Sequence, residues 1–314
     1  MRKPRAPSIW ASRTGERYLG YDRAELDRQY DLLVRHGDSV EVFARLGATL
    51  SARARALPGA TMNVAYGGAP AMTMDLYPAT QPGAPVIAFV RGGYWRHGDK
   101  ADLGCIALGL VPRGCAVAVI GHSAPGELGL AAIADEVCTA MLWLRGHAGR
   151  LNGDGKRLIA AGHGSGAHLA ALTPTADWTR LEEDDRARSP IAGVVALSGF
   201  FDLEPVRLSF LNMDLRLDAA AVPQLSPLRL APALPQPTPP YLLIVGERET
   251  DEYHRHMAGY AAALERHGAR VTAATLAGHH HFSLAAELAD PSSLITNHVI
   301  ALARTAAAGD SVPI

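Results

Sequence analysis

The stretch that decides the fold is 157-RLIAAGHGSGAHLAA-171, an apolar run followed by a glycine-rich turn and then by small residues. The first five residues have the composition of a buried strand, and the residues after the turn favour a helix. Glycine punctuates the junction, as it does where a chain must turn sharply. The stretch therefore predicts a strand, a tight turn and a helix in direct succession.

The turn in this stretch has the spacing of a nucleophile elbow, in which a catalytic side chain stands at the tip of a strained corner. Small residues are required two positions before and after the tip, because the strained backbone brings those positions against the neighbouring strand and helix. Gly162 and Gly166 meet this requirement and place Gly164 at the tip. Centring the pattern on Ser165 would put the bulky His163 in a tight position, so we expect Ser165 to follow the tip.

Short β-rich runs alternate with helical runs on both sides of this stretch, which predicts an α/β fold with a mostly parallel, twisted sheet of about eight strands and helices on both faces. The predicted strands are 62–66, 72–77, 85–90, 116–120, 157–161, 191–197, 241–245 and 270–275. The predicted helices are 102–111, 130–144, 166–172, 254–267 and 292–307. The first two strands flank a Gly-Gly pair at 67–68, which predicts a hairpin at the sheet edge.

We expect residues 1–314 to form one domain, because α/β folds of this length often share a single core. Apolar residues recur at helical spacing within 22–56, so residues 1–57 are predicted as a helical segment that packs over the core. Residues 204–240 carry proline and leucine without a clear period. They are predicted as an irregular insertion near the mouth of the active site.

The composition favours a small-molecule partner. The net charge of −1 provides no field that would attract nucleic acid or an anionic membrane. The sequence contains no apolar run long enough to span a membrane, and its first residues do not have the pattern expected of a secretory leader. Its three cysteines are isolated in apolar stretches, as expected of buried thiols in a reducing cytoplasm. The exposed edges of such a sheet allow a homodimer.

Beyond the elbow, several strings in a fixed order resemble the arylformamidase (kynurenine formamidase)-like branch of the α/β-hydrolases, over residues 21–300. The strings are 25-ELDRQY-30, 66-YG-67, 75-DLY-77, 92-GGYWR-96, 99-DK-100, 198-SGFFDLEP-205, 226-SP-227, 245-VGERE-249 and 281-HFS-283. The resemblance implies an α/β-hydrolase fold and an esterase-like or formamidase-like activity without a cofactor or metal.

The resemblance also implies a set of site positions, three of which carry unexpected residues. In that family the elbow carries serine and a histidine precedes the glycine pair, whereas this chain has Gly164 and Arg91 there. The family acid and histidine match Glu249 and His281. A family tyrosine after the fourth strand is replaced by Gly121 or His122.

The remaining chemistry is expected to reside in His281, oriented by Glu249 or alternatively by Asp251 or Glu252. A competing interpretation treats the three histidines 279–281 as a surface tract or a chance metal-binding run. The backbone N–H groups of Ser165 and of Gly92 or Gly93 would form an oxyanion hole, because a backbone donor survives the loss of a neighbouring side chain.

The loop that follows the third strand is expected to shape the substrate pocket. Arg91 suits a carboxylate or an enolate oxygen, or else forms a salt bridge with Asp99 or Asp102. The substrate-binding residues predicted with it are Tyr94, Trp95, His122 and His163.

Three functions fit this pattern. The favoured one is an enzyme in which His281 acts as a general base, either for serine-independent hydrolysis or for elimination, cyclisation or proton transfer, on a small aromatic or carboxylated compound. The second is a ligand-binding protein that has lost catalysis. In the third, Gly164 is an engineered change in an ordinary ester or formamide hydrolase.

Overall fold

Eight strands form a single sheet at the centre of the computed structural model, which describes residues 18–126, 128–184 and 187–305. Their order across the sheet is β1-β2-β4-β3-β5-β6-β7-β8. Their bounds are β1 Thr61–Ala65, β2 Thr73–Tyr77, β3 Ala84–Val90, β4 Ala116–Ile120, β5 Gly153–His163, β6 Ile191–Leu197, β7 Tyr241–Gly246 and β8 Val271–Leu276.

The strand directions confirm the predicted sheet. β3 pairs in parallel with β4 and β5, and the parallel pairing continues through β6, β7 and β8. Only β2 runs against its neighbours, since it pairs antiparallel with both β1 and β4. The predicted edge hairpin is therefore present, although its connection covers residues 66–72 and not a two-residue Gly-Gly turn.

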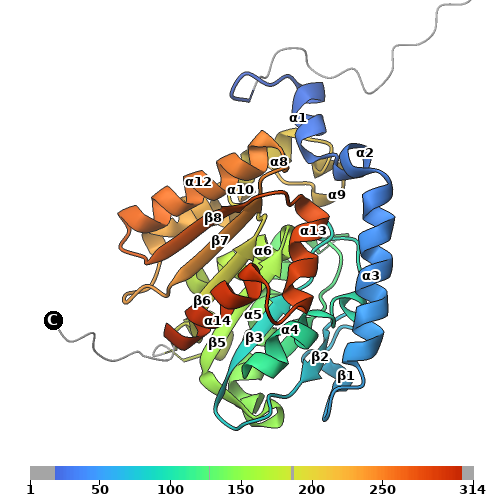
Figure 1. The fold of residues 1–314 in the computed structure, drawn as a ribbon. Helices are drawn as coiled ribbons and strands as arrows, with labels where there is room; N and C mark the ends of the chain where they lie inside the picture. The colour runs from blue at the N-terminus through green and yellow to red at the C-terminus, as the bar shows by residue number, and fades with distance from the viewer. Residues whose placement is uncertain (1–17, 127, 185–186, 306–314) are drawn as a thin grey trace, which may run out of the picture.

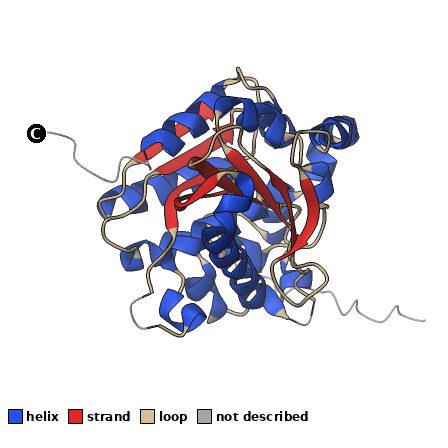
Figure 2. Ribbon diagram, turned by 90° about the horizontal axis from the view of Figure 1, so that it is seen from below, coloured by secondary structure: helices blue, strands red, loops and turns tan. Residues whose placement is uncertain are grey.

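Helices cover both faces of the sheet, as Figures 1 and 2 show. The helices along the chain are α1 Arg23–Tyr30, α2 Leu32–His36, α3 Asp38–Ala54, α4 Ile106–Leu110, α5 Gly129–His147, α6 Ser165–Leu172, α7 Trp178–Glu182, α8 Glu204–Leu208, α9 Asn212–Leu215, α10 Ala221–Leu225, α11 Pro227–Leu230, α12 Asp251–Arg266, α13 His281–Ala286 and α14 Leu294–Thr305. The 3-10 turns include η1 Lys100–Asp102 and η6 Glu287–Ala289. Among the described residues, no helix is both long enough and apolar enough to cross a membrane.

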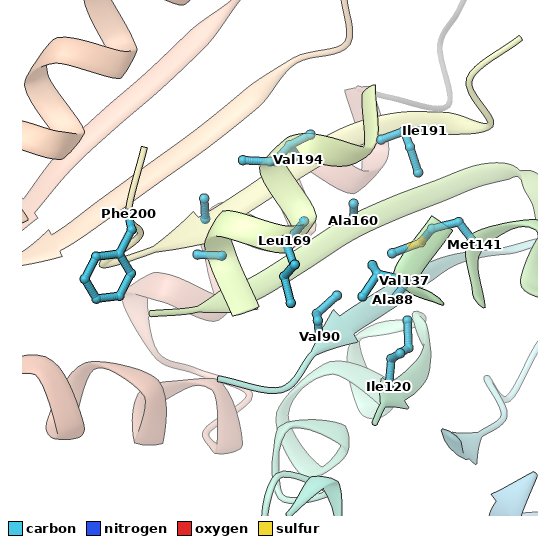
Figure 3. Close-up of a cluster of buried hydrophobic side chains, with 14 of the residues drawn as sticks. Ala88, Val90, Ile120, Val137, Met141, Ala160, Leu169, Ile191, Val194 and Phe200 are labelled. Carbon is cyan, nitrogen blue, oxygen red and sulfur yellow. The ribbon is translucent and has the colours of Figure 1, made fainter. Parts of the chain in front are cut away.

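Strand β3 shows how the sheet separates two cores. Val86, Ala88 and Val90 point into one core, which α5, α6 and α12 cover, and Figure 3 shows part of it. Ile87 and Phe89 point into the other core, beneath α4, α13 and α14. Because successive side chains of a strand alternate between faces, a strand buried on both faces is apolar throughout, as β3 is.

The helical predictions need correction in two regions. Residues 204–240 are not irregular throughout, because α8 to α11 lie within them; proline occupies the first turn of α8 and α11, where its missing N–H costs nothing. Residues 102–111 do not form one helix: Asp102 is the last residue of η1, and α4 covers only Ile106–Leu110. The short helix α13, which begins at His281, was not predicted.

The N-terminal segment is helical over residues 23–54, while residues 1–17 lie outside the described part of the chain. The Asp22 side chain caps α1 by accepting from the Glu25 N–H at 2.8 Å. The end of α1 is anchored by Tyr30, whose hydroxyl donates to Glu252 on α12 at 2.9 Å. From there α3 runs beside α13, η1 and α4 on one side of the molecule (Figure 1).

His168 on α6 links three parts of the fold. Its Nδ1 accepts from the indole N–H of Trp95 at 3.1 Å, and its Nε2 donates to the Leu225 carbonyl at 2.7 Å. Burial lowers the pKa of His168 to about 4, against a small opposing contribution from the Leu225 hydrogen bond. The ring is therefore neutral in the folded protein at neutral pH.

The lowered pKa of His168 predicts that the folded protein loses stability in acid. The unfolded chain takes up the proton near pH 6.5 and the folded chain only near pH 4, so stability is lost as the pH falls between these values. Between pH about 7 and about 5, His168 should account for a loss of about 2 kcal/mol in the free energy of unfolding. Urea unfolding of the parent and of His168→Gln at both pH values measures it; an equal pH dependence in the two proteins would contradict the assignment.

Candidate active site

The predicted elbow is present between β5 and α6. Gly164 lies at its tip with φ +58° and ψ −122°, a conformation that side chains rarely adopt. Its N–H donates to the Leu197 carbonyl at the end of β6, at 2.9 Å. The tip is thereby fixed between the two central strands, at the carboxyl edge of the sheet where α/β folds place their sites.

The glycines on either side of the tip are required by close backbone contact, as predicted. A Cβ on Gly162 would lie 2.3 Å from the carbonyl carbon of Gly166, and a Cβ on Gly166 would lie 2.2 Å from the Val90 oxygen. The loop after β3 is equally close, since a Cβ on Gly92 would lie 2.5 Å from the His163 oxygen. The end of β3 with its loop, the end of β5 and the start of α6 therefore contact one another through backbone atoms around Gly164.

Ser165 is the first residue of α6, and its side chain holds the neighbouring loop. Its Oγ accepts a hydrogen bond from the Trp95 backbone N–H at 2.9 Å, and the side chain is buried. Gly93 and Ser165 both line the cavity described below, and neither N–H donates to a protein acceptor in the described residues. Of the two glycines that the sequence left open, Gly93 is thus the better placed as a second donor beside Ser165.

Arg91 does not face the substrate, contrary to the expectation that it binds an anion or pairs with an acid. Its guanidinium is buried and donates to the carbonyls of His97 at 2.7 Å, His122 at 2.8 Å and Gly92 at 3.3 Å. Burial lowers its pKa, with nearby acids such as Asp99 opposing this. Arg91 therefore connects the loop after β3 to the loop after β4 through these hydrogen bonds.

Two further predicted pocket residues are also turned into the protein. Trp95 is fully buried with its indole bonded to His168, and His122 is buried with its Nδ1 2.7 Å from the Ser123 carbonyl. Burial and then the Arg91 charge lower the pKa of His122 to about 4, so this ring is neutral. Of the expected aromatic residues, only Tyr94 and His163 line the cavity.

His281 and Glu249 meet as the sequence predicted. Glu249 Oε2 accepts from His281 Nδ1 at 2.8 Å, and both side chains are buried. Because an ionised carboxylate can only accept, this bond places the proton on Nδ1 and leaves Nε2 free to act as a base.

Glu249 is held as a carboxylate by three donors. Burial alone would raise its pKa, but His281, the Ser198 hydroxyl and the Gly246 N–H lower it to about 2. The two other acids that the sequence allowed for orienting His281 are placed differently. Glu252 pairs with Arg255 and Tyr30, and Asp251 is exposed at the start of α12.

Sequence reasoning missed Ser198 and Tyr253 as neighbours of this pair. Ser198 follows β6 with φ +50° and donates to Glu249, while the Tyr253 ring lies 5.0 Å from the His281 ring. The only available signal was the position of Ser198 at the end of a predicted strand. Tyr253 is brought in by the packing of α12, which leaves no local pattern.

His163 also packs against the base, with its ring tilted by 45° relative to that of His281. Its ring centroid lies 4.1 Å from that of His281, and burial together with His281 lowers the pKa of His163 to about 3. His280 turns away and stacks on His36 of α2 at 4.7 Å. No cluster of three or more metal-binding side chains occurs among residues 18–126, 128–184 and 187–305.

An open space separates Gly164 from the base. An ideal Cβ on Gly164 would lie 3.3 Å from His281 Nε2 and 3.5 Å from Cε1, with no other neighbour within 4 Å beyond the adjoining chain. A serine hydroxyl placed there would reach the ring nitrogen. With glycine, the same space is left for a small molecule.

The space opens into an apolar cavity of about 270 Å³. Its lining comes from α2, α3, the loop after β3, the elbow, α4, and the α13–η6 segment, and not from 204–240 as the sequence suggested. The lining residues are Leu32, Val40, Phe43, Ala44, Leu46, Gly47, Leu50, Phe89, Gly93, Tyr94, Asp102, Leu103, Cys105, Ile106, His163, Gly164, Ser165, Phe200, His281, Phe282, Ala285, Ala286 and Ala289.

Comparisons with known proteins agree with the fold and with the sequence resemblance. The BD-FAE family model matches residues 74–225. A kynurenine formamidase of Danio rerio is 27% identical over 78% of this chain and 82% of its own, and esterase LipC of Mycobacterium tuberculosis is 30% identical over 59% and 50%. A solved putative thioesterase of Silicibacter sp. superposes with a TM-score of 0.73, at 24% identity over 89% of this chain and 99% of its own.

A serine hydroxyl at the elbow tip should be activated as a nucleophile by the pair His281 and Glu249. In Gly164→Ser the Oγ comes within hydrogen-bonding reach of His281 Nε2, so hydrolysis of p-nitrophenyl acetate should rise by about 100-fold or more. The strained φ should cost about 1–3 kcal/mol of stability.

Gly164→Ala is the matched control, because it adds the same Cβ and strain without a nucleophile. It should show the stability loss and no gain in rate. A folded Gly164→Ser with the parent's rate would show that the pair is not assembled for acyl transfer.

Proposed function

We propose that this chain, an esterase- or formamidase-type α/β-hydrolase, hydrolyses a neutral ester or amide by direct attack of water activated by His281. The observation that carries the proposal is the open space between Gly164 and His281 Nε2, where a Cβ would lie 3.3 Å from the nitrogen. A water that enters this space from the cavity can donate a hydrogen bond to the base, because general bases act at hydrogen-bond distances of about 2.6–3.2 Å.

The pair His281 and Glu249 supplies the base. The buried carboxylate fixes the imidazole orientation and stabilises the imidazolium that forms during proton transfer. His163 packs against the ring and stays neutral, so it adds no charge that would oppose protonation of His281.

The reaction balances without a covalent enzyme intermediate. The water oxygen bonds to the carbonyl carbon while its proton passes to His281 Nε2. The carbonyl oxygen becomes an oxyanion, which the N–H groups of Gly93 and Ser165 can stabilise. When the intermediate collapses, the alcohol or amine leaves with the proton from His281, and the acid is released.

The cavity favours a neutral substrate over a carboxylated one. Its lining contains neither Lys nor Arg among the described residues, and its one acidic side chain outside the Glu249 pair is Asp102 at the rim. The expected cation, Arg91, is occupied by three carbonyl groups. An anionic group would therefore lose its hydration without gaining a partner.

Removal of the base tests this proposal. His281→Ala should lower kcat/KM for the parent's best ester or formanilide substrate by about 100-fold or more, and His279→Ala, two residues away, should leave it within about twofold. Glu249→Gln should also lower kcat/KM, and at every pH at which the protein is folded, because the carboxylate with its pKa of about 2 is ionised throughout.

Unchanged turnover in His281→Ala would refute the mechanism. Tight ligand binding by the parent with no product from any bound ester or amide would instead identify a binding protein.

A further inference from the structure

We propose that the cavity beside His281 binds an unbranched aliphatic chain of the substrate, laid between α3 and the α13–η6 segment. The inference rests on the proposed function only for the position of the reacting carbonyl at Gly164. The binding of the chain itself is independent of turnover.

Two apolar stripes form the walls of this slot. On α3 the stripe runs from Val40 through Phe43 and Gly47 to Leu50, at helical spacings of three and four residues, so it spans about 15 Å. On the other side Phe282, Ala285, Ala286 and Ala289 face it from α13 and η6. The two helices pack against each other, and Figure 1 shows them side by side.

The slot has a reactive end and a closed end. Phe282 lies 5.5 Å from His281, which places this end at the catalytic pair. At the other end, the Cys105 N–H donates to the Ser51 Oγ at 2.9 Å, which ties α3 to the start of α4.

The chemistry between these ends favours a narrow aliphatic chain. The lining includes five small residues, namely Ala44, Gly47, Ala285, Ala286 and Ala289, beside the aliphatic Leu50 and Ile106. The aromatic Phe282 lies 5.5 Å from His281, and Tyr94 and Phe200 pack on each other with ring centroids 6.3 Å apart. Small and aliphatic lining residues leave room that a methylene chain can fill.

A second observation points to a ligand in this cavity. His281 is only 7% exposed, and its Nε2 has no hydrogen-bond partner among the described residues although its Nδ1 is bonded. The nitrogen faces the space above Gly164, at the reactive end of the slot. Because His281 lines the cavity, a molecule that binds there can reach this nitrogen.

The chain-length dependence follows from burial. Each methylene that leaves water contributes about fourfold to binding, so kcat/KM should rise steeply along the acyl series until the slot is filled. In the parent, p-nitrophenyl octanoate should be hydrolysed far better than the acetate.

Leucine substitutions in the slot should shorten it. Ala44→Leu and Ala286→Leu should each lower kcat/KM for the octanoate by about tenfold or more and leave the acetate within about twofold. Ala52→Leu, which adds the same volume on the same helix at a residue that does not line the cavity, should leave both unchanged.

Titration with 1-decanol separates the slot from the catalysis. The parent should bind it, and Ala44→Leu should bind it at least about tenfold more weakly. Decanol binding without ester turnover would support the slot and refute the proposed function. Equal decanol binding by Ala44→Leu and the parent, or an acyl profile in which benzoate exceeds octanoate, would overturn the aliphatic slot.

Discussion

The site depends on the close contact of three backbone segments that carry no side chains where they meet. Gly166 lies against Val90, Gly162 against Gly166, and Gly92 against His163, each so close that a Cβ would overlap the neighbour. This contact forces the corner at Gly164 and turns the start of α6 toward the loop after β3. The backbone donors are therefore positioned by the fold and do not require a side chain at position 164.

The base is also positioned without any contribution from a side chain at position 164. Glu249 is fixed by Ser198, Gly246 and His281, all outside the elbow, so the His281 pair is complete with glycine at the tip. Because the cavity is apolar, the few dipoles that face the reacting carbonyl are weakly screened and act strongly. The arrangement can stabilise an oxyanion and accept a proton, and what it lacks is a nucleophile of its own.

The sequence predicted the features that local pattern encodes. The alternation of strands and helices and the glycines around the elbow follow from short-range rules, and the family resemblance implied Glu249 and His281 after β7 and β8. The direction of long side chains does not: Arg91, Trp95 and His122 were expected in the pocket but are bonded inside the protein. The helix α3 forms a cavity wall only through tertiary packing. The short helices within the proline-rich region 204–240 also depend on tertiary packing, so the sequence pattern did not predict them.

The most direct test of the central claim is whether the protein ever carries the acyl group. The parent and Gly164→Ser would be mixed with p-nitrophenyl octanoate, quenched in acid during turnover, and weighed intact by mass spectrometry. Direct attack by water predicts no mass increase on the parent and an acyl adduct on Gly164→Ser. An acyl adduct on the parent, on Ser165 or on any other residue, would contradict the account.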